Sequence, residues 1–161
     1  MAPEPITLAA IDMSLSESQI QRYSRHILLP DVGGVGQRRL LASAAALVLG
    51  PERPASAVAL AYLAAAGVGR IDVASADDAV TEAEVAGNLV LGIEDAGRER
   101  LAAVRERIAA LNPDVRITAG AASSALRVEP DEPGDPSDVG AALVAGGRAA
   151  VGAIMTLSGR A

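Results

Sequence analysis

Arginine supplies all fourteen basic side chains of this 161-residue chain, and the other residues able to do chemistry are few. Lysine and cysteine are both absent, and His26 is the only histidine. Without cysteine, thiolate catalysis, disulfides and cysteine-type zinc sites are excluded. Without lysine, a Schiff base and a P-loop lysine are excluded too. The sequence therefore predicts no catalytic nucleophile of these kinds and no metal site.

The arginines are the remaining candidates for binding an anion. Arg22 and Arg25 stand on a helix predicted from Ser16 to about His26, because Ser16 and Gln19 have the spacing of a capping box. A guanidinium group presents fixed donors that suit phosphates and carboxylates. Arg25 could equally pair with a nearby acid or cap the helix, and His26 is expected to be structural.

Apolar runs and Gly/Pro punctuation predict the elements that position these residues. Strands are expected at 45–49, 70–74 and 115–119, and helices at 37–42, 56–66, 97–111 and 139–157. Strand, helix and strand in this order imply a parallel pair with a right-handed crossover. We expect an α/β, Rossmann-like, three-layer fold with a reduced, mostly parallel sheet of three or four strands.

The domain organisation is simple. Residues 1–13 are predicted to form a flexible tail and 14–161 a single domain, in which the acidic, proline-rich stretch 129–138 is a solvated linker before the last helix. The N-terminus has no basic n-region, so the expected location is the cytoplasm. Arg148 lies mid-way along the last helix, which favours a buried helix over a membrane span. The net charge of −6 argues against a nucleic-acid partner.

Three segments of the chain resemble the ThiF/MoeB-like family of ubiquitin-activating-type adenylating enzymes. They are RYSRHILLPDVGGVGQRRLLASA, AYLAAAGVGRIDV and GRERLAAVRERIAALNPDVRI, in the family's order, across roughly residues 16–118. The last helix is similar to the family's late apolar helix. The family adenylates the C-terminal glycine of a ubiquitin-like or sulfur-carrier protein with Mg-ATP and is usually dimeric, and the resemblance implies the same fold here.

The resemblance also shows where this chain departs from the family. The glycines of the family's phosphate loop, G-x-G-G-x-G, fall on Pro51, Arg53, Pro54 and Ser56. Two prolines remove backbone N–H donors, and Glu52 adds a negative charge. Arg53 could supply some attraction for phosphate, although it cannot replace the close backbone approach.

Other positions of the family's nucleotide site are altered as well. The aspartate that holds the ribose is replaced by Ser75, while the second aspartate of that motif persists as Asp77. The family's phosphate-contacting lysine corresponds to Arg100, for which a plain surface charge on a helix is the competing interpretation. Arg25 matches an arginine that reaches the partner subunit's ATP phosphates, and Arg22 is close to it.

The sequence thus favours a non-catalytic ThiF/MoeB-like homologue that acts as a binding or dimerisation partner and needs no cofactor. The expected partner is a second copy or a complete ThiF/MoeB-like protein, with a ubiquitin-like sulfur carrier as a further candidate. The alternative is a minimal adenylyltransferase that uses Mg-ATP on such a carrier's C-terminus. A third hypothesis is a Rossmann module that binds a nucleotide without adenylation.

Overall fold

The computed structural model describes residues 14–75, 79–120 and 122–159, so the predicted tail at 1–13 lies outside the described part. Seven α-helices, one 3-10 turn and four strands are seen there. In chain order they are α1 Glu17–Arg22, α2 Ser24–Ile27, α3 Gly33–Ala42, β1 Ala44–Leu49, α4 Pro54–Ala66, β2 Arg70–Ser75, α5 Glu82–Val85, the 3-10 turn η1 Ile93–Asp95, α6 Arg100–Leu111, β3 Arg116–Ala119, β4 Leu126–Arg127 and α7 Val139–Ser158.

The four strands form one parallel sheet in the order β3-β2-β1-β4. Leu47 of β1 lies beside Val73 of β2, and Ile71 of β2 lies beside Ile117 of β3. The α/β, Rossmann-like class with a reduced parallel sheet is confirmed, and β4 is the fourth strand, which the sequence did not locate.

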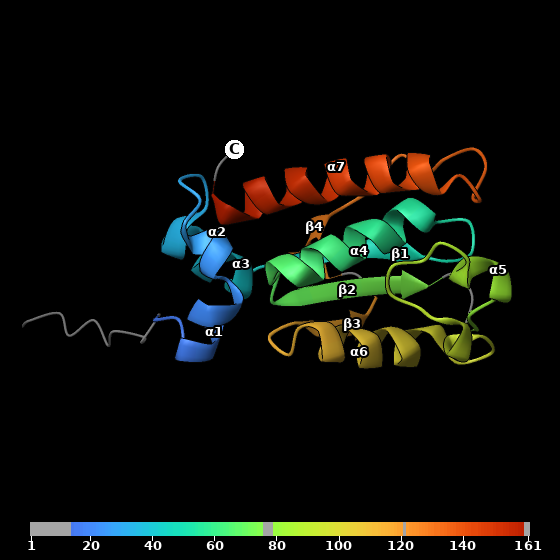
Figure 1. The fold of residues 1–161 in the computed structure, drawn as a ribbon, viewed down its shortest axis with the longest axis horizontal. Coiled ribbons are helices and arrows are strands. Elements are labelled where there is room, and N and C mark those ends of the chain that lie inside the picture. Colours follow the sequence, from blue (N-terminus) through green and yellow to red (C-terminus); the bar gives the residue numbers. More distant parts are fainter. Residues whose placement is uncertain (1–13, 76–78, 121, 160–161) are drawn as a thin grey trace, which may run out of the picture.

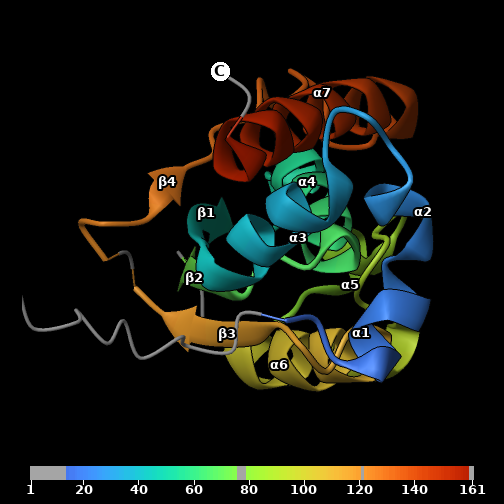
Figure 2. The same ribbon diagram turned by 90° about the vertical axis from the view of Figure 1, so that its left-hand side faces the viewer.

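The helices are distributed unevenly over the two faces of this sheet. Figures 1 and 2 show α4, α6 and α7 on the same side, so that the described residues make two layers rather than the three expected. The reason lies in the connection from β3 to β4. It is a short loop across the other face, where the Ala122 N–H donates to the Asp72 carboxylate at 3.0 Å, and no helix is inserted there.

The core fills the space between the sheet and these helices with small aliphatic side chains. Leu47, Leu63 and Ile108 are at most 2% exposed, and the only buried aromatic ring in the described residues is that of Tyr23. Small side chains let backbones approach closely. A Cβ added to Gly146 of α7 would lie 2.3 Å from the Ala55 carbonyl oxygen of α4. Glycine is therefore required where α7 crosses α4.

Three predicted helices differ most from the structure. The helix expected from Ser16 to His26 is broken at Tyr23, whose φ of −102° and ψ of 16° leave the helical region as its ring turns into the core. The capping box of Ser16 and Gln19 is present. Helix α3 begins at Gly33, earlier than expected, and α6 begins at Arg100, later than expected.

Helix α7 is confirmed, but the expectation that it is buried holds for one face only. It packs on α4 and α3 through Ala142, Gly146 and Ala150, whereas Val144 and Val151 are 63% and 60% exposed. By length and composition alone it could cross a membrane, and 22% of the qualifying span is buried within the protein.

Candidate functional site

The candidate site is the carboxyl edge of β1, where the resemblance places a nucleotide's phosphates. The chain turns there through Gly50 and enters α4 at Pro54, which occupies the first turn, where a missing N–H costs nothing. The next two backbone N–H groups, of Ala55 and Ser56, have no partner within the helix and point outward. A helix N-terminus of this kind attracts anions.

The anion at this helix terminus is the chain's own Glu132. Its Oε2 accepts from the Ala55 N–H at 2.8 Å, and its Oε1 accepts from the Ser56 N–H at 2.9 Å. The Ser56 hydroxyl also donates to Oε1, at 2.5 Å. Both carboxylate oxygens are therefore engaged by donors that lie 76 and 77 residues away in the sequence.

This contact corrects the interpretation of 129–138 as a solvated linker. The stretch does lead into α7, and several of its residues are exposed, but Glu132 is partly buried against α4. The physical reason is the unsatisfied start of α4. A carboxylate that reaches it gains charge-assisted hydrogen bonds and a favourable interaction with the helix dipole.

A second carboxylate, that of Glu84, is paired with the Arg100 guanidinium. The side chains of Arg100 and Glu84 form a two-pronged ion pair, with Nε to Oε1 at 2.8 Å and Nη2 to Oε2 at 2.7 Å. The same guanidinium donates to the Ser75 hydroxyl and the Ala79 carbonyl, each at 2.8 Å. Arg100 is fully buried, so its interpretation as a surface charge is wrong. The start of α6 faces the protein interior, and Glu84 compensates the buried charge.

Little space remains beside the Glu84 carboxylate at this edge. A cavity of about 10 Å³ lies there, lined in part by Arg53, Glu84 and Asn88. That volume suits about one water molecule and is far below what a nucleotide needs. The Asn88 side chain accepts from the N–H groups of Val90 and Leu91 at 2.8 and 3.0 Å, so it serves the local turn.

The predicted site residues are divided between the two ends of the sheet. Arg53 is exposed, and it lines the small cavity together with Glu84, the partner of Arg100. Asp77 lies outside the described residues. Arg22 and Arg25 belong to α1 and α2, at the opposite, amino end of the strands (Figure 1). Arg22 is paired with Asp114 at 2.6 Å, whereas Arg25 is exposed.

Residues from all three signature segments meet at this amino end. The Tyr23 hydroxyl contacts Asn112 and Asp114, while the Asn112 amide also donates to the Ala64 carbonyl at 2.8 Å. A Cβ on Gly67, whose φ is +84°, would lie 2.6 Å from the Tyr23 ring. The signature residues thus hold α1, α4 and α6 together, and this structural role does not depend on the phosphate loop.

His26 and Gln37 make a second link at the same end. The His26 Nδ1 lies 3.1 Å from the Gln37 Oε1, and the buried Gln37 amide donates to the Ala66 carbonyl at 2.9 Å. The expectation that His26 is structural agrees with this geometry. Its ring also stacks on Tyr23, with 6.3 Å between the ring centroids.

Sequence reasoning missed Glu132 and Glu84 as the carboxylates of the site, and it also missed Asp95 as the acceptor of a separate buried ion-pair cluster. Asp95 is fully buried and accepts from Arg98, Arg107 and the Gly92 N–H at 2.7, 2.8 and 2.9 Å. Burial raises the pKa of its carboxyl, but these donors outweigh burial and hold the pKa below the ordinary value. The sequence signal that could have pointed toward this region is the capping pattern Thr81-x-x-Glu84, because the Thr81 hydroxyl accepts from the Glu84 N–H at 3.2 Å.

Chemically, the edge offers no free anion donors in the described residues, other than the exposed Arg53, and no reactive nucleophile. Within the same residues no group of three His, Asp or Glu side chains could hold a metal ion. The arrangement is that of a phosphate-type site whose donors already have carboxylate partners.

Comparison with known proteins agrees with this architecture. The ThiF family profile matches residues 23–131, which is more than half of the chain. The chain belongs to the ThiF family. Among curated relatives of this ThiF-family protein, the probable adenylyltransferase/sulfurtransferase MoeZ of Mycobacterium tuberculosis is 40% identical over 104 residues. The sulfur carrier protein ThiS adenylyltransferase of Escherichia coli is 36% identical over 105 residues.

The match is partial for all of these relatives. It covers 65% of this chain but 26% of MoeZ and 41% of the ThiS adenylyltransferase. Among solved structures, the E. coli tRNA N6-threonylcarbamoyladenosine dehydratase TcdA in complex with ATP has a TM-score of 0.57 at 21% identity. That alignment covers 66% of this chain and 42% of TcdA, and at this identity it shows the fold alone.

Proposed function

We propose that this ThiF-family protein is a non-catalytic binding partner that does not use a nucleotide of its own. The observation that carries the proposal is the Glu132 carboxylate on the Ala55 and Ser56 N–H groups. A triphosphate at the same place would have to displace an intramolecular anion. It would also meet the negative charge of Glu52 beside that helix terminus.

Two further features support the same proposal. The buried Arg100 cannot reach a phosphate without leaving Glu84, and that would leave a carboxylate buried without its partner. The cavity of about 10 Å³ gives a base and ribose no room. No cofactor is therefore proposed for the chain acting alone.

The alternative is an ATP-dependent adenylyltransferase acting on the C-terminus of a sulfur carrier. The observation that favours it is the relatives' activity, since their names describe adenylyltransferases, one of them specific for the carrier ThiS. For this chain the activity would require Glu132 and the 129–138 stretch to move away from α4. The alignment with this chain also covers only 26% of MoeZ and 41% of the ThiS adenylyltransferase.

The proposed partner is a complete ThiF-family adenylating enzyme in the cytoplasm, and a sulfur carrier is a further candidate. The exposed Arg25 at the amino end of the sheet is free to contact such a partner, whereas Arg22 is held by Asp114. The signature network at that end keeps α1 and α2 in place without any nucleotide.

Calorimetric titration of the chain with Mg-ATP tests the proposal. We expect no saturable binding up to millimolar ATP. We also expect no carrier-dependent exchange of pyrophosphate into ATP. Saturable micromolar binding together with such exchange would instead establish the adenylyltransferase, whereas binding without exchange would indicate a nucleotide-binding module.

A further inference from the structure

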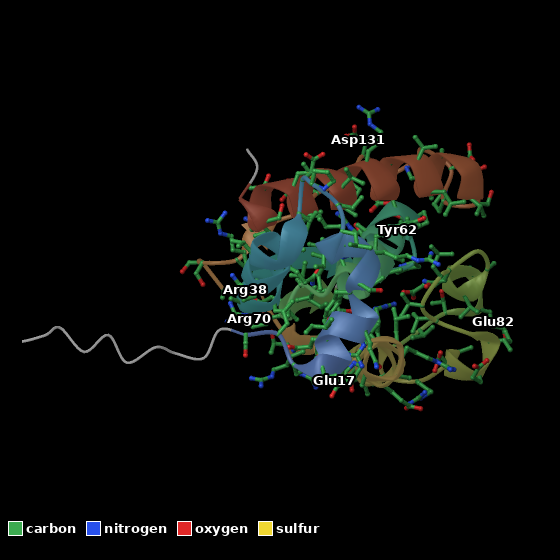
Figure 3. All side chains as sticks on the ribbon, turned by 60° about the vertical axis from the view of Figure 1, so that its left-hand side comes forward. Glu17, Arg38, Tyr62, Arg70, Glu82 and Asp131 are labelled. Carbon is green, nitrogen blue, oxygen red and sulfur yellow. The ribbon has the colours of Figure 1, made fainter. Side chains whose placement is uncertain are left out.

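A cavity of about 560 Å³ lies at the amino end of the sheet, at the opposite end of the strands from the candidate site. This amino-end pocket is built from the starts of β1, β2 and β3, and its walls include Ser43, Gly69, Arg70, Asp114 and Arg116. Figure 3 brings the amino end of the strands forward and labels Arg70 there. The volume lies in the range of small-molecule sites, so the chemistry of the walls decides what the pocket binds.

Two arginines stand side by side in these walls. Arg70 of β2 and Arg116 of β3 are register partners in the parallel pair, so their backbones lie about 4.8 Å apart. The residues that follow them, Ile71 and Ile117, are buried in the core, so both arginines project from the opposite face of the sheet. Like charges on neighbouring strands repel each other. The pair therefore favours an anion that lies between the two guanidinium groups.

The carboxylate closest to this pair does not neutralise it. Asp72 accepts from the Thr118 hydroxyl and from the Ala122 N–H, so its oxygens are already bonded. Its Oδ1 lies 3.1 Å from the Arg70 Nε, close enough for an ion pair. The Arg70 Nε is nevertheless buried without an aligned hydrogen-bond acceptor in the described part of the chain. Arg116 is exposed and forms no ion pair with any described residue.

The carboxylate of Asp114, which also lines the pocket, is neutralised by other groups. It pairs with Arg22 at 2.6 Å and accepts from the Tyr23 hydroxyl at 3.0 Å. The Ser43 hydroxyl, in another wall, donates to the Leu40 carbonyl at 2.8 Å. The pocket is thus locally positive in a chain whose net charge is −6, so this positive charge does not follow from the overall composition.

We propose that the amino-end pocket binds a small organic molecule through a phosphate group held between the Arg70 and Arg116 guanidiniums. Guanidinium groups present paired N–H donors that match phosphate oxygens. A phosphomonoester carries about 1.5 to 2 negative charges at neutral pH, which suits two arginines better than a single carboxylate does. The pocket is larger than a phosphate requires, so the organic part has room beside it. The inference goes beyond the proposed function and does not depend on it.

Calorimetric titration of the intact chain with phenyl phosphate tests this proposal. We expect saturable binding that Arg116→Gln weakens by about tenfold or more, because the variant loses charge-assisted hydrogen bonds to the phosphate. Arg127→Gln is the matched control, since it makes the same charge change on an exposed strand residue outside the pocket, and it should bind as the wild type does. An absence of saturable binding, or equal weakening in both variants, would overturn the proposal.

Inorganic phosphate, used as a second ligand, separates the phosphate group from the molecule that carries it. We expect it to bind about tenfold more weakly than phenyl phosphate, because the ring also contacts apolar wall residues such as Ala42 and Pro113. Arg116→Gln should weaken the binding of both ligands. Equal affinities for the two ligands would assign the pocket to free phosphate and overturn the organic ligand.

Backbone amide chemical shifts locate the bound phosphate. We expect phenyl phosphate to shift the amides of Gly69, Arg70 and Arg116 and to leave those of Ala55 and Ser56 unchanged. Shifts at Ala55 and Ser56 instead would place the phosphate at the start of α4, which overturns this inference and also counts against the proposed function. An absence of any shift would overturn this inference alone. In the Mg-ATP titration, heat that persists in Arg116→Gln would come from the carboxyl edge, whereas heat that the variant removes would come from this pocket.

Discussion

The Asn112 side chain donates a hydrogen bond to the Tyr23 hydroxyl at 2.9 Å, across 89 residues of sequence. Tyr23 lies in the first segment that resembles the family, and Asn112 lies in the third. The same amide donates to the Ala64 carbonyl, in the second segment. One buried contact thus joins three separate signatures, at the end of the sheet opposite the changed phosphate loop.

Replacing Asn112 with Ala should therefore destabilise the fold without touching the candidate site. The change leaves the Tyr23 hydroxyl and the Ala64 carbonyl buried without their donor, which costs about 1–3 kcal/mol in the free energy of unfolding. Urea denaturation measures the loss. Asn88→Ala is the control, because the Asn88 amide bonds only to its own local turn. A larger loss of stability in Asn88→Ala than in Asn112→Ala would contradict the prediction.

The tyrosine hydroxyl at this junction should titrate late. The pKa of Tyr23 is raised to about 12, chiefly by burial; the nearby Asp114 also raises it, whereas Asn112 and Arg22 lower it. In a Tyr62→Phe variant the only tyrosine is Tyr23, so the absorbance of tyrosinate should rise with a midpoint near 12.

The sign of the linked stability follows from the raised pKa. The folded state favours the neutral phenol, so this contribution is complete below the unfolded value of about 10 and is lost as pH rises toward 12. A midpoint at about 10 in the folded variant would show that the hydroxyl is solvated.

Replacing Glu132 with Ala should destabilise the start of α4. Two backbone N–H groups and the Ser56 hydroxyl lose their acceptor, and the helix loses a favourable charge, so we expect a loss of about 1–2 kcal/mol. Thermal unfolding with Asp131→Ala as the neighbouring control measures it. Equal stability of the two variants would mean that Glu132 is solvated.

Cutting one side of the Arg100–Glu84 pair should be more severe. Arg100→Ala strands the Glu84 carboxylate in the interior, for an expected loss of about 3–5 kcal/mol. A double variant, Arg100→Met with Glu84→Leu, removes both charges and should recover a substantial part of that loss. If it is as unstable as the single variant, the pair's remaining contacts with Ser75 and Ala79 carry the effect.

Stability should also fall in acid. Burial raises the pKa of the Asp95 and Asp72 carboxyls, but hydrogen bonds from arginine, threonine and backbone N–H groups outweigh it and hold both below their ordinary values. The unfolded carboxyl binds a proton near pH 3.9, before the folded one. The contribution is therefore complete above that pH and is lost as pH falls through the folded pKa.

Urea titrations across the acidic range measure this slope. Asp95→Asn should be less stable at neutral pH and show a shallower decline below about pH 4 than the wild type. Asp135→Asn is an exposed control, whose carboxyl is bonded only to Ser137. An unchanged slope in Asp95→Asn would place the acid sensitivity elsewhere.

The sequence by itself determined the α/β class, most helices and the family resemblance. Apolar runs bounded by Gly and Pro report local burial and chain reversal, so α4, α6 and α7 were predicted within a few residues. The loss of backbone N–H donors in the phosphate loop also follows from the sequence alone, because proline lacks an N–H in any conformation.

Only the tertiary structure decided what fills the candidate site and which helix face stays open. Glu132 lies 76 residues from Ser56 in the sequence. Arg100 lies 16 residues from Glu84, and the sequence between them shows no clear hydrophobic periodicity. No local pattern encodes which distant carboxylate reaches a donor, because that depends on how β4 and α7 return across the sheet. The exposed face of α7 is likewise fixed by Gly146 against Ala55, a contact that periodicity cannot locate.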